Sequence, residues 1–147
     1  MMTITVLNRQ RAVRMNIAAL REFVASAVTQ CLKLRAPQPG TLARLVSVEV
    51  ILVSDRRMAQ LHRRFLGAPG PTDVITFQHG EILISTETAR RQARAFATSL
   101  EDELRLYVAH GLLHLHGYDD KMSEGAAVMK RAQEKLVRLA TADVPSG

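Results

Sequence analysis

Residues 104–120, LRLYVAHGLLHLHGYDD, combine a strong helical pattern with a defined helix end. At about 100° per residue, one face of this helix carries the residues Leu104, Val108, Leu112 and Leu115. Nearly opposite lie Glu103, Tyr107, His110 and His114. The two histidines are four residues apart, so they are neighbours about one turn apart. We therefore expect a fold that buries the leucine face and leaves the histidine face open.

Acidic residues follow the end of this helix closely. Gly117 can adopt positive φ and turn the chain back over the helix end, which would bring Asp119 or Asp120 to the two histidines. Two neutral imidazoles and one carboxylate, with a fourth position for water, are typical of a catalytic zinc site. The alternative is a pair of half-buried polar side chains on a helix surface. The combination of histidine pair, glycine and acid favours the metal.

Strand patterns occur in four other places. Alternation of polar and apolar residues predicts strands over Thr3–Leu7 and Val46–Val53. Two shorter strands, Asp73–Phe77 and Glu81–Ser85, are separated by three polar residues and are spaced as in a hairpin.

About five helices are predicted around these strands. The first begins at Asn16 as N-cap and ends before the proline-rich segment 36–40, and the second begins at Ser54 or Asp55 and ends near Phe65. The third is Ser85–Ala97, with Ser85 as its cap. The others are the histidine helix opened by a Thr98–Glu101 capping box, and Met122–Ala140, with residues 141–147 as a frayed tail. Without regular βαβ alternation, these elements predict an α+β fold with four strands.

Composition limits the protein class. A length of 147 residues fits one domain, residues 1–147, and the single cysteine excludes an internal disulfide. We find neither a signal peptide nor an apolar run that would span a bilayer, so we expect a cytoplasmic protein. A formal charge of +6, mostly from arginine, favours a polyanionic partner and a solvated basic surface about equally.

Three ordered blocks resemble one known family. His110–Asp120 resembles the signature H-G-x-L-H-L-x-G-Y-D-H of the YbeY family of bacterial metal-dependent endoribonucleases. Pro71–Phe77 resembles the family's P-T-D-V-L-S-F block, and Gly80–Ser85 its G-D-I-x-I-S strand. The helix around Ala89–Ala93 fits as well, and the resemblance covers Leu52 to about Leu139.

The resemblance implies an α+β fold with a mixed sheet and a histidine-bearing helix along a cleft. It implies hydrolysis of single-stranded RNA, with roles in ribosomal RNA maturation and ribosome quality control at the small ribosomal subunit. It also implies one zinc ion, held here by His110, His114 and Asp120. Zinc lowers the pKa of a bound water towards neutrality, and the resulting hydroxide can attack a phosphodiester.

The chain departs from the family pattern at two positions. Asp120 stands where the family usually has a third histidine; a carboxylate also binds zinc but reduces the charge and the Lewis acidity of the site. Asp119 is the alternative ligand, and His116 lies off the ligand stripe. Leu66 stands where the family carries an arginine. Our candidate RNA contacts are therefore nearby residues, namely Arg63, Arg64, Thr72 and Asp73.

Several functional alternatives remain. Asp73 and Glu81 are candidates for a general base, although a turn cap and a strand-edge charge are simpler roles for them. A metallopeptidase would need a glutamate where Gly111 follows the first histidine, which disfavours that class. A non-catalytic ribosome assembly factor with a structural zinc is the main rival. With only 4% aromatic residues, extensive base stacking is not expected.

Overall fold

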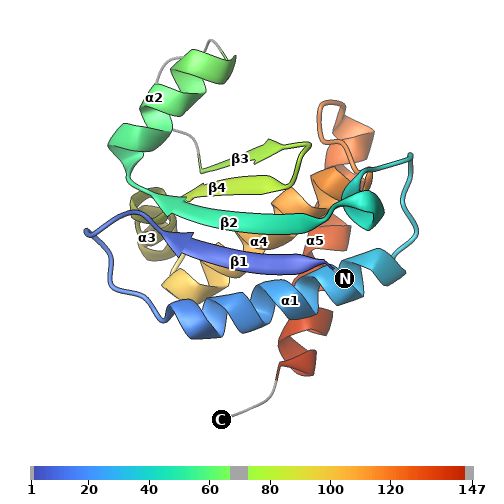
Figure 1. The fold of residues 1–147 in the computed structure, drawn as a ribbon, viewed down its shortest axis with the longest axis horizontal. Coiled ribbons are helices and arrows are strands. Elements are labelled where there is room, and N and C mark those ends of the chain that lie inside the picture. Colours follow the sequence, from blue (N-terminus) through green and yellow to red (C-terminus); the bar gives the residue numbers. More distant parts are fainter. Residues whose placement is uncertain (1, 67–72, 145–147) are drawn as a thin grey trace.

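The computed structural model describes residues 2–66 and 73–144. Its centre is a four-stranded sheet in the order β1 (Thr3–Asn8), β2 (Ser47–Val53), β4 (Glu81–Ser85) and β3 (Val74–Phe77) (Figure 1). β2 is parallel to both β1 and β4, whereas β3 is antiparallel to β4. The expected mixed sheet and the hairpin are therefore confirmed, and β3 is an edge strand.

Five α-helices surround the sheet in the described part of the chain. They are α1 (Ile17–Lys33), α2 (Asp55–Leu66), α3 (Thr86–Ala95), α4 (Leu100–His116) and α5 (Ser123–Asp143), with a short 3-10 turn at Leu42–Arg44. The α+β class predicted from the sequence is confirmed.

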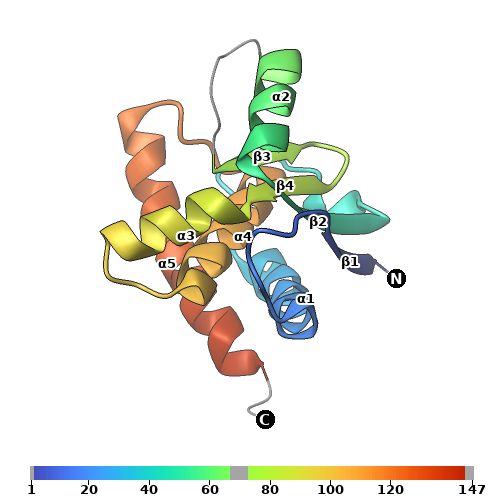
Figure 2. The same ribbon diagram turned by 90° about the vertical axis from the view of Figure 1, so that its left-hand side faces the viewer.

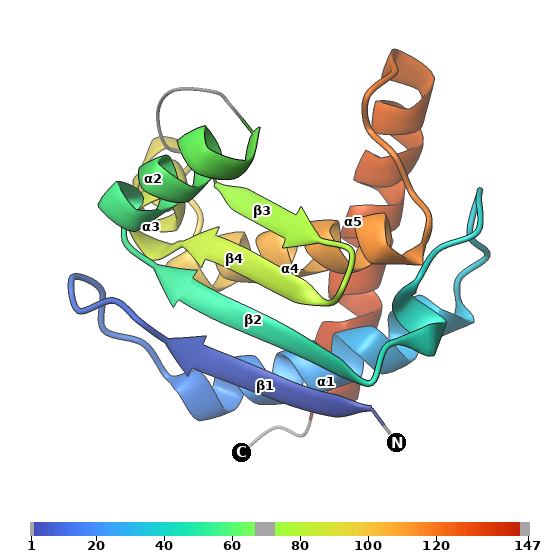
Figure 3. The same ribbon diagram turned by 45° about the horizontal axis from the view of Figure 1, so that its top comes forward.

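The sheet separates two apolar clusters of unequal size. In the larger one, α1 and α4 pack against one face of the sheet, which contributes Val50, Leu52 and Ile82, and α5 packs on α1 and α4 (Figure 2). α2 covers part of the other face with Met58 and Leu61, over the end of the sheet formed by β3 and β4 (Figure 3). α4 thus lies in the interior, and the edge strand β3 lies beside it.

The first half of α4 is more buried than the sequence predicted. Glu103 and Tyr107, expected on an open face, are only 7% and 8% exposed. The reason is α3, which packs against α4, and the preceding loop, where the Thr98 hydroxyl donates to Glu103 Oε1 at 3.2 Å. Only the C-terminal part of the histidine face is left open.

Most helix starts agree with the sequence. Asn16 and Ser85 cap α1 and α3 as expected, and of the two residues considered for α2 it is Ser54 whose Oγ accepts from Arg57 N at 3.1 Å. The predicted cap of α4, Thr98, is wrong by one residue, because the N-cap is Ser99. Ser99 Oγ accepts from the Asp102 amide at 3.0 Å, because the Thr98 hydroxyl is already engaged by Glu103.

The last helix is longer than expected. α5 continues to Asp143, three residues into the segment that we expected to fray. The Arg105 guanidinium donates to Thr141 Oγ1 at 3.2 Å, and Gln30 Nε2 donates to Asp143 Oδ2 at 3.4 Å. These contacts with α4 and α1 hold the end of α5. Residues 145–147 lie outside the described residues.

Candidate metal centre

Three potential metal ligands meet at the C-terminal end of α4. His110 Nε2 lies 3.0 Å from His114 Nε2. Asp120, in the segment between α4 and α5, directs Oδ2 to His110 Nε2 and Oδ1 to His114 Nε2, each at 3.5 Å. The structure therefore brings together the three residues that the sequence combined.

A tight turn delivers Asp120 to the histidines. Gly117 has a φ of +113°, and a Cβ at this position would lie 2.0 Å from the carbonyl oxygen of Gln38. The Tyr118 amide then donates to Leu113 O at 2.9 Å, and the Tyr118 hydroxyl donates to Arg35 O at 2.9 Å. Only glycine fits both the backbone conformation and the space.

The ring of His110 is oriented by a residue that the sequence analysis missed. His110 Nδ1 lies 2.8 Å from Gln133 Oε1 on α5. An amide oxygen only accepts hydrogen bonds, so Nδ1 carries the hydrogen and Nε2 presents its lone pair to His114 and Asp120. A signal was present: Gln133 interrupts the buried stripe of Met129 and Leu136 on α5.

The donor set fits a divalent metal ion. One ligand atom from each of the three residues lies within 4.8 Å of the others. Burial, and then the neighbouring His110, lower the pKa of His114 despite the opposing effect of Asp120. A neutral imidazole is the form that binds metal, and the two Nε2 atoms, 3.0 Å apart, are close enough to bind the same ion. Two imidazoles and a carboxylate suit zinc.

Hollows open on both sides of the histidines. One, of about 280 Å³, is lined by His110 and Asp120 together with Asp73, Tyr107 and Gln133 among others. The other, of about 360 Å³, is lined by His114 and Asp120 together with Gln78, Arg44 and Lys121 among others. Asp73 and Gln78 directly precede and follow β3, so the edge strand runs alongside both hollows.

The predicted RNA contacts are only partly gathered here. Asp73 lines the hollow beside His110, whereas Arg63 and Arg64 lie on the exposed surface of α2 and line neither hollow next to the histidines. Thr72 and the side chain of Leu66 lie outside the described residues. Two basic residues do line the hollow beside His114, namely Arg44 and Lys121, and no pattern in the sequence pointed to them.

Asp119, Glu81 and His116, which the sequence analysis also considered, do not join the cluster of potential metal ligands. Asp119 Oδ1 accepts from the Lys121 amide at 3.0 Å, which makes it a turn-forming residue. His116 Nε2 donates to Leu34 O at 2.7 Å, away from the cluster. Glu81 is not an edge charge: β4 is an inner strand, and the Glu81 carboxylate pairs with His79.

Sequence comparison places the chain in a known family. The family model described as Endoribonuclease YbeY matches residues 5–140. The chain belongs to the YbeY family. It is 41% identical over 104 residues to "Endoribonuclease YbeY" of Thermus thermophilus, covering 63% of this chain and 75% of that protein. It is 33% identical over 135 residues to the Moorella thermoacetica protein of the same name, covering 79% and 86%.

A solved structure has the same fold. The solution structure of TM1509 from Thermotoga maritima aligns with a TM-score of 0.64 and 27% identity, covering 97% of this chain and 91% of that one. Membership of the YbeY family identifies the protein as an enzyme of the endoribonuclease class.

Two further observations concern the cysteine and the apolar content of the helices. Cys31 is a free thiol buried in the core, where burial raises its pKa to about 12. Within residues 2–66 and 73–144, no helix has the length and apolar content to cross a membrane.

Proposed function

We propose that the protein is a cytoplasmic, zinc-dependent endoribonuclease that cleaves single-stranded RNA in ribosomal RNA maturation and ribosome quality control, with the small ribosomal subunit as partner. The observation that carries this proposal is the convergence of His110, His114 and Asp120 between two open hollows. Family membership supplies the class of reaction.

The three converging residues would hold the metal, and each has a defined task. His110 is fixed by Gln133, and His114 stays neutral because its pKa is lowered. Asp120 adds a negative charge and approaches both rings from the turn after α4. A bound divalent ion supplies Lewis acidity, which activates water for attack on a phosphodiester.

The hollows supply the other groups that the reaction needs. Asp73 is an exposed carboxylate in the hollow beside His110. We assign it the role of general base, which accepts the proton of the attacking water. Arg44 and Lys121, in the hollow beside His114, are positioned to hold phosphate oxygens. In this assignment the RNA backbone passes along the edge strand β3 from one hollow to the other.

A peptidase is disfavoured by the packing of α4. Gly111 follows the first histidine, and a Cβ there would lie 2.8 Å from Ile82 Cγ2 in the core. A glutamate at this position would point into the sheet, not towards the cleft. The base that activates water in H-E-x-x-H peptidases therefore has no place here.

A ribosome assembly factor with a structural metal is the second candidate. Its support is that the ligands join α4 to the following turn, so a metal would brace that turn. The test is His114→Ala, assayed for cleavage of a single-stranded oligoribonucleotide and for thermal stability. Loss of cleavage with a melting temperature within a few degrees of wild type supports the enzyme. Retained cleavage would contradict it.

A further inference from the structure

Three rings and a guanidinium form a ladder on the sheet face opposite α4. The rings of Phe65 and Phe77 meet edge to face, with centroids 5.5 Å apart and an angle of 81°. Phe77 and His79 are stacked, with centroids 5.6 Å apart and an angle of 13°. The Arg64 guanidinium carbon lies 5.3 Å from the Phe65 ring centroid. We call these four residues the aromatic ladder.

The ladder is fixed at its centre and open at its ends. Phe77 packs against the smaller apolar cluster, which includes Ile75 and Leu83. Phe65 is 52% exposed, and the side chain of His79 is 65% exposed. Exposed aromatic rings held by a partly buried neighbour form a preorganised stacking surface, which loses little conformational entropy when a flat ligand binds.

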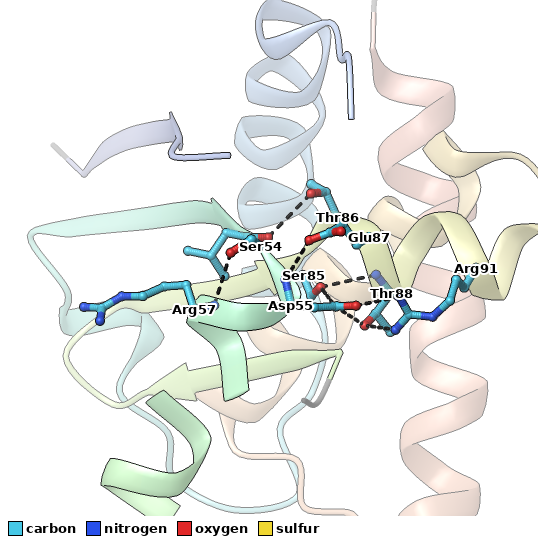
Figure 4. Close-up of polar contacts among 9 residues, drawn as sticks. Ser54, Asp55, Arg57, Ser85, Thr86, Glu87, Thr88 and Arg91 are labelled. Atoms are coloured by element: carbon cyan, nitrogen blue, oxygen red, sulfur yellow. Dashed lines mark hydrogen bonds and ion pairs between the residues drawn. The ribbon is translucent and has the colours of Figure 1, made fainter. Parts of the chain in front are cut away.

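The surface of α2 is basic along its length, and Arg63 and Arg64 lie just before Phe65 in the sequence. The exposed surface of α2 carries the four arginines Arg56, Arg57, Arg63 and Arg64. Asp55, the single acid in the sequence of α2, is at the far end of the helix and is engaged elsewhere. Figure 4 shows its carboxylate accepting from Ser85, Thr88 and Arg91 of the β4–α3 region, so it does not neutralise these arginines.

The ladder also reaches the candidate metal centre. Phe77 is the last residue of β3, and the next residue, Gln78, lines the hollow that contains His114. The Thr41 hydroxyl donates to Gln78 O at 3.2 Å and holds this corner. A chain that leaves the ladder over the end of β3 therefore enters the hollow beside the histidines.

We propose that the aromatic ladder stacks bases of single-stranded RNA while the α2 arginines bind its phosphates, so that the strand is held next to the metal centre. Rings that stack bases beside a basic surface are the combination by which proteins hold single strands with little sequence preference. The proposal rests on the proposed function and gives it a substrate-holding surface. Aromatic residues are few in the chain, but the fold gathers two of the four phenylalanines here.

The test is binding of two fluorescent oligomers of equal length, an oligouridylate and its abasic ribose-phosphate counterpart. Fluorescence anisotropy is measured in chelator, so that no cleavage occurs. Phe65→Leu should weaken binding of the base-bearing strand by about 5- to 100-fold and leave the abasic strand unchanged. Phe96→Leu is the matched control, because Phe96 is 68% exposed on another part of the surface. Arg64→Gln should weaken both oligomers and reduce the salt dependence.

The outcomes separate the ladder from the proposed function. If Phe65→Leu binds the oligouridylate as tightly as wild type, the ladder is wrong, whether or not the metal-loaded enzyme cleaves RNA. The ladder is also wrong if the wild type binds the two oligomers equally, because stacking then contributes nothing. If Phe65→Leu selectively loses the base-bearing strand while the metal-loaded wild type fails to cleave it, the ladder stands and the endoribonuclease assignment falls.

Discussion

Gln133 Oε1 on α5 lies 2.8 Å from His110 Nδ1 on α4, so a residue 23 positions further along the chain sets the tautomer of a candidate metal ligand. The contact ties the two helices together at the point where the site opens. It also leaves Nε2 as the free lone pair of His110, facing His114 and Asp120.

Replacement of Gln133 should lower the affinity for metal and change the free energy of unfolding only slightly. Gln133→Leu keeps the size of the side chain but removes the acceptor, and loss of such an outer partner typically costs about 10- to 100-fold in metal affinity. Competition with a chromophoric chelator measures this change. The matched control is Gln60→Leu on the exposed surface of α2, which should bind metal as wild type does. Equal affinity for Gln133→Leu would contradict the assigned role.

The turn at Gly117 should tolerate no side chain. Gly117→Ala places a Cβ against the Gln38 carbonyl at a φ of +113°, so we expect a loss of about 1–3 kcal/mol in the free energy of unfolding. Urea denaturation monitored by circular dichroism measures it. The same variant should lose metal, because Asp120 follows this turn. Stability equal to that of wild type would show that the turn is not as tight as described.

Contact between Gly111 and Ile82 predicts a rescue. Gly111→Ala should destabilise the protein by about 1–3 kcal/mol, because the new methyl group meets the Ile82 side chain at 2.8–2.9 Å. Ile82→Ala removes these atoms, and the added alanine methyl then fills part of the space. The double variant should therefore be no less stable than Ile82→Ala alone. Additive losses in a double-mutant cycle would show that the two sites do not touch.

Asp55 should make stability depend on pH. Burial raises the pKa of Asp55, but hydrogen bonds from Arg91, Ser85 and Thr88 outweigh it, and the pKa is lowered overall. A lowered pKa in the folded state stabilises the protein above the unfolded-state value of about 4, and this contribution is lost as pH falls through the folded-state pKa.

The measurement for Asp55 compares urea denaturation at pH 7 and at acidic pH. Asp55→Asn should be clearly less stable than wild type at pH 7, and the difference should shrink at low pH. The control Glu134→Gln, at an exposed position on α5, should stay close to wild type at both values. A difference between Asp55→Asn and wild type that does not change with pH would contradict the assignment.

Local patterns predicted the elements well because their causes are local. Caps at Asn16 and Ser85, the glycine at the end of α4 and the apolar alternation in β2 act within a few residues, and all appear as expected. The prediction of fraying was wrong for residues 141–143, because α5 is held there by Arg105 and Gln30, which are far away in the sequence.

The site was predictable in part for the same reason. His110, His114 and Asp120 lie within eleven consecutive residues, so helix periodicity and one turn bring them together. Gln133 and the basic residues Arg44 and Lys121 reach the site only through tertiary packing. Tyr107 looked exposed on the helix, but α3 covers that side of α4, which no pattern within α4 reveals.

The most direct test of the metal centre is metal content by elemental mass spectrometry on wild type, Asp120→Ala and Asp119→Ala purified in parallel. Asp119 is the matched control, since it is the adjacent carboxylate but bonds the Lys121 amide. We predict close to one zinc per chain in wild type and in Asp119→Ala, and a sharp loss in Asp120→Ala. Equal zinc in wild type and Asp120→Ala, or no metal in wild type, would contradict the site described here.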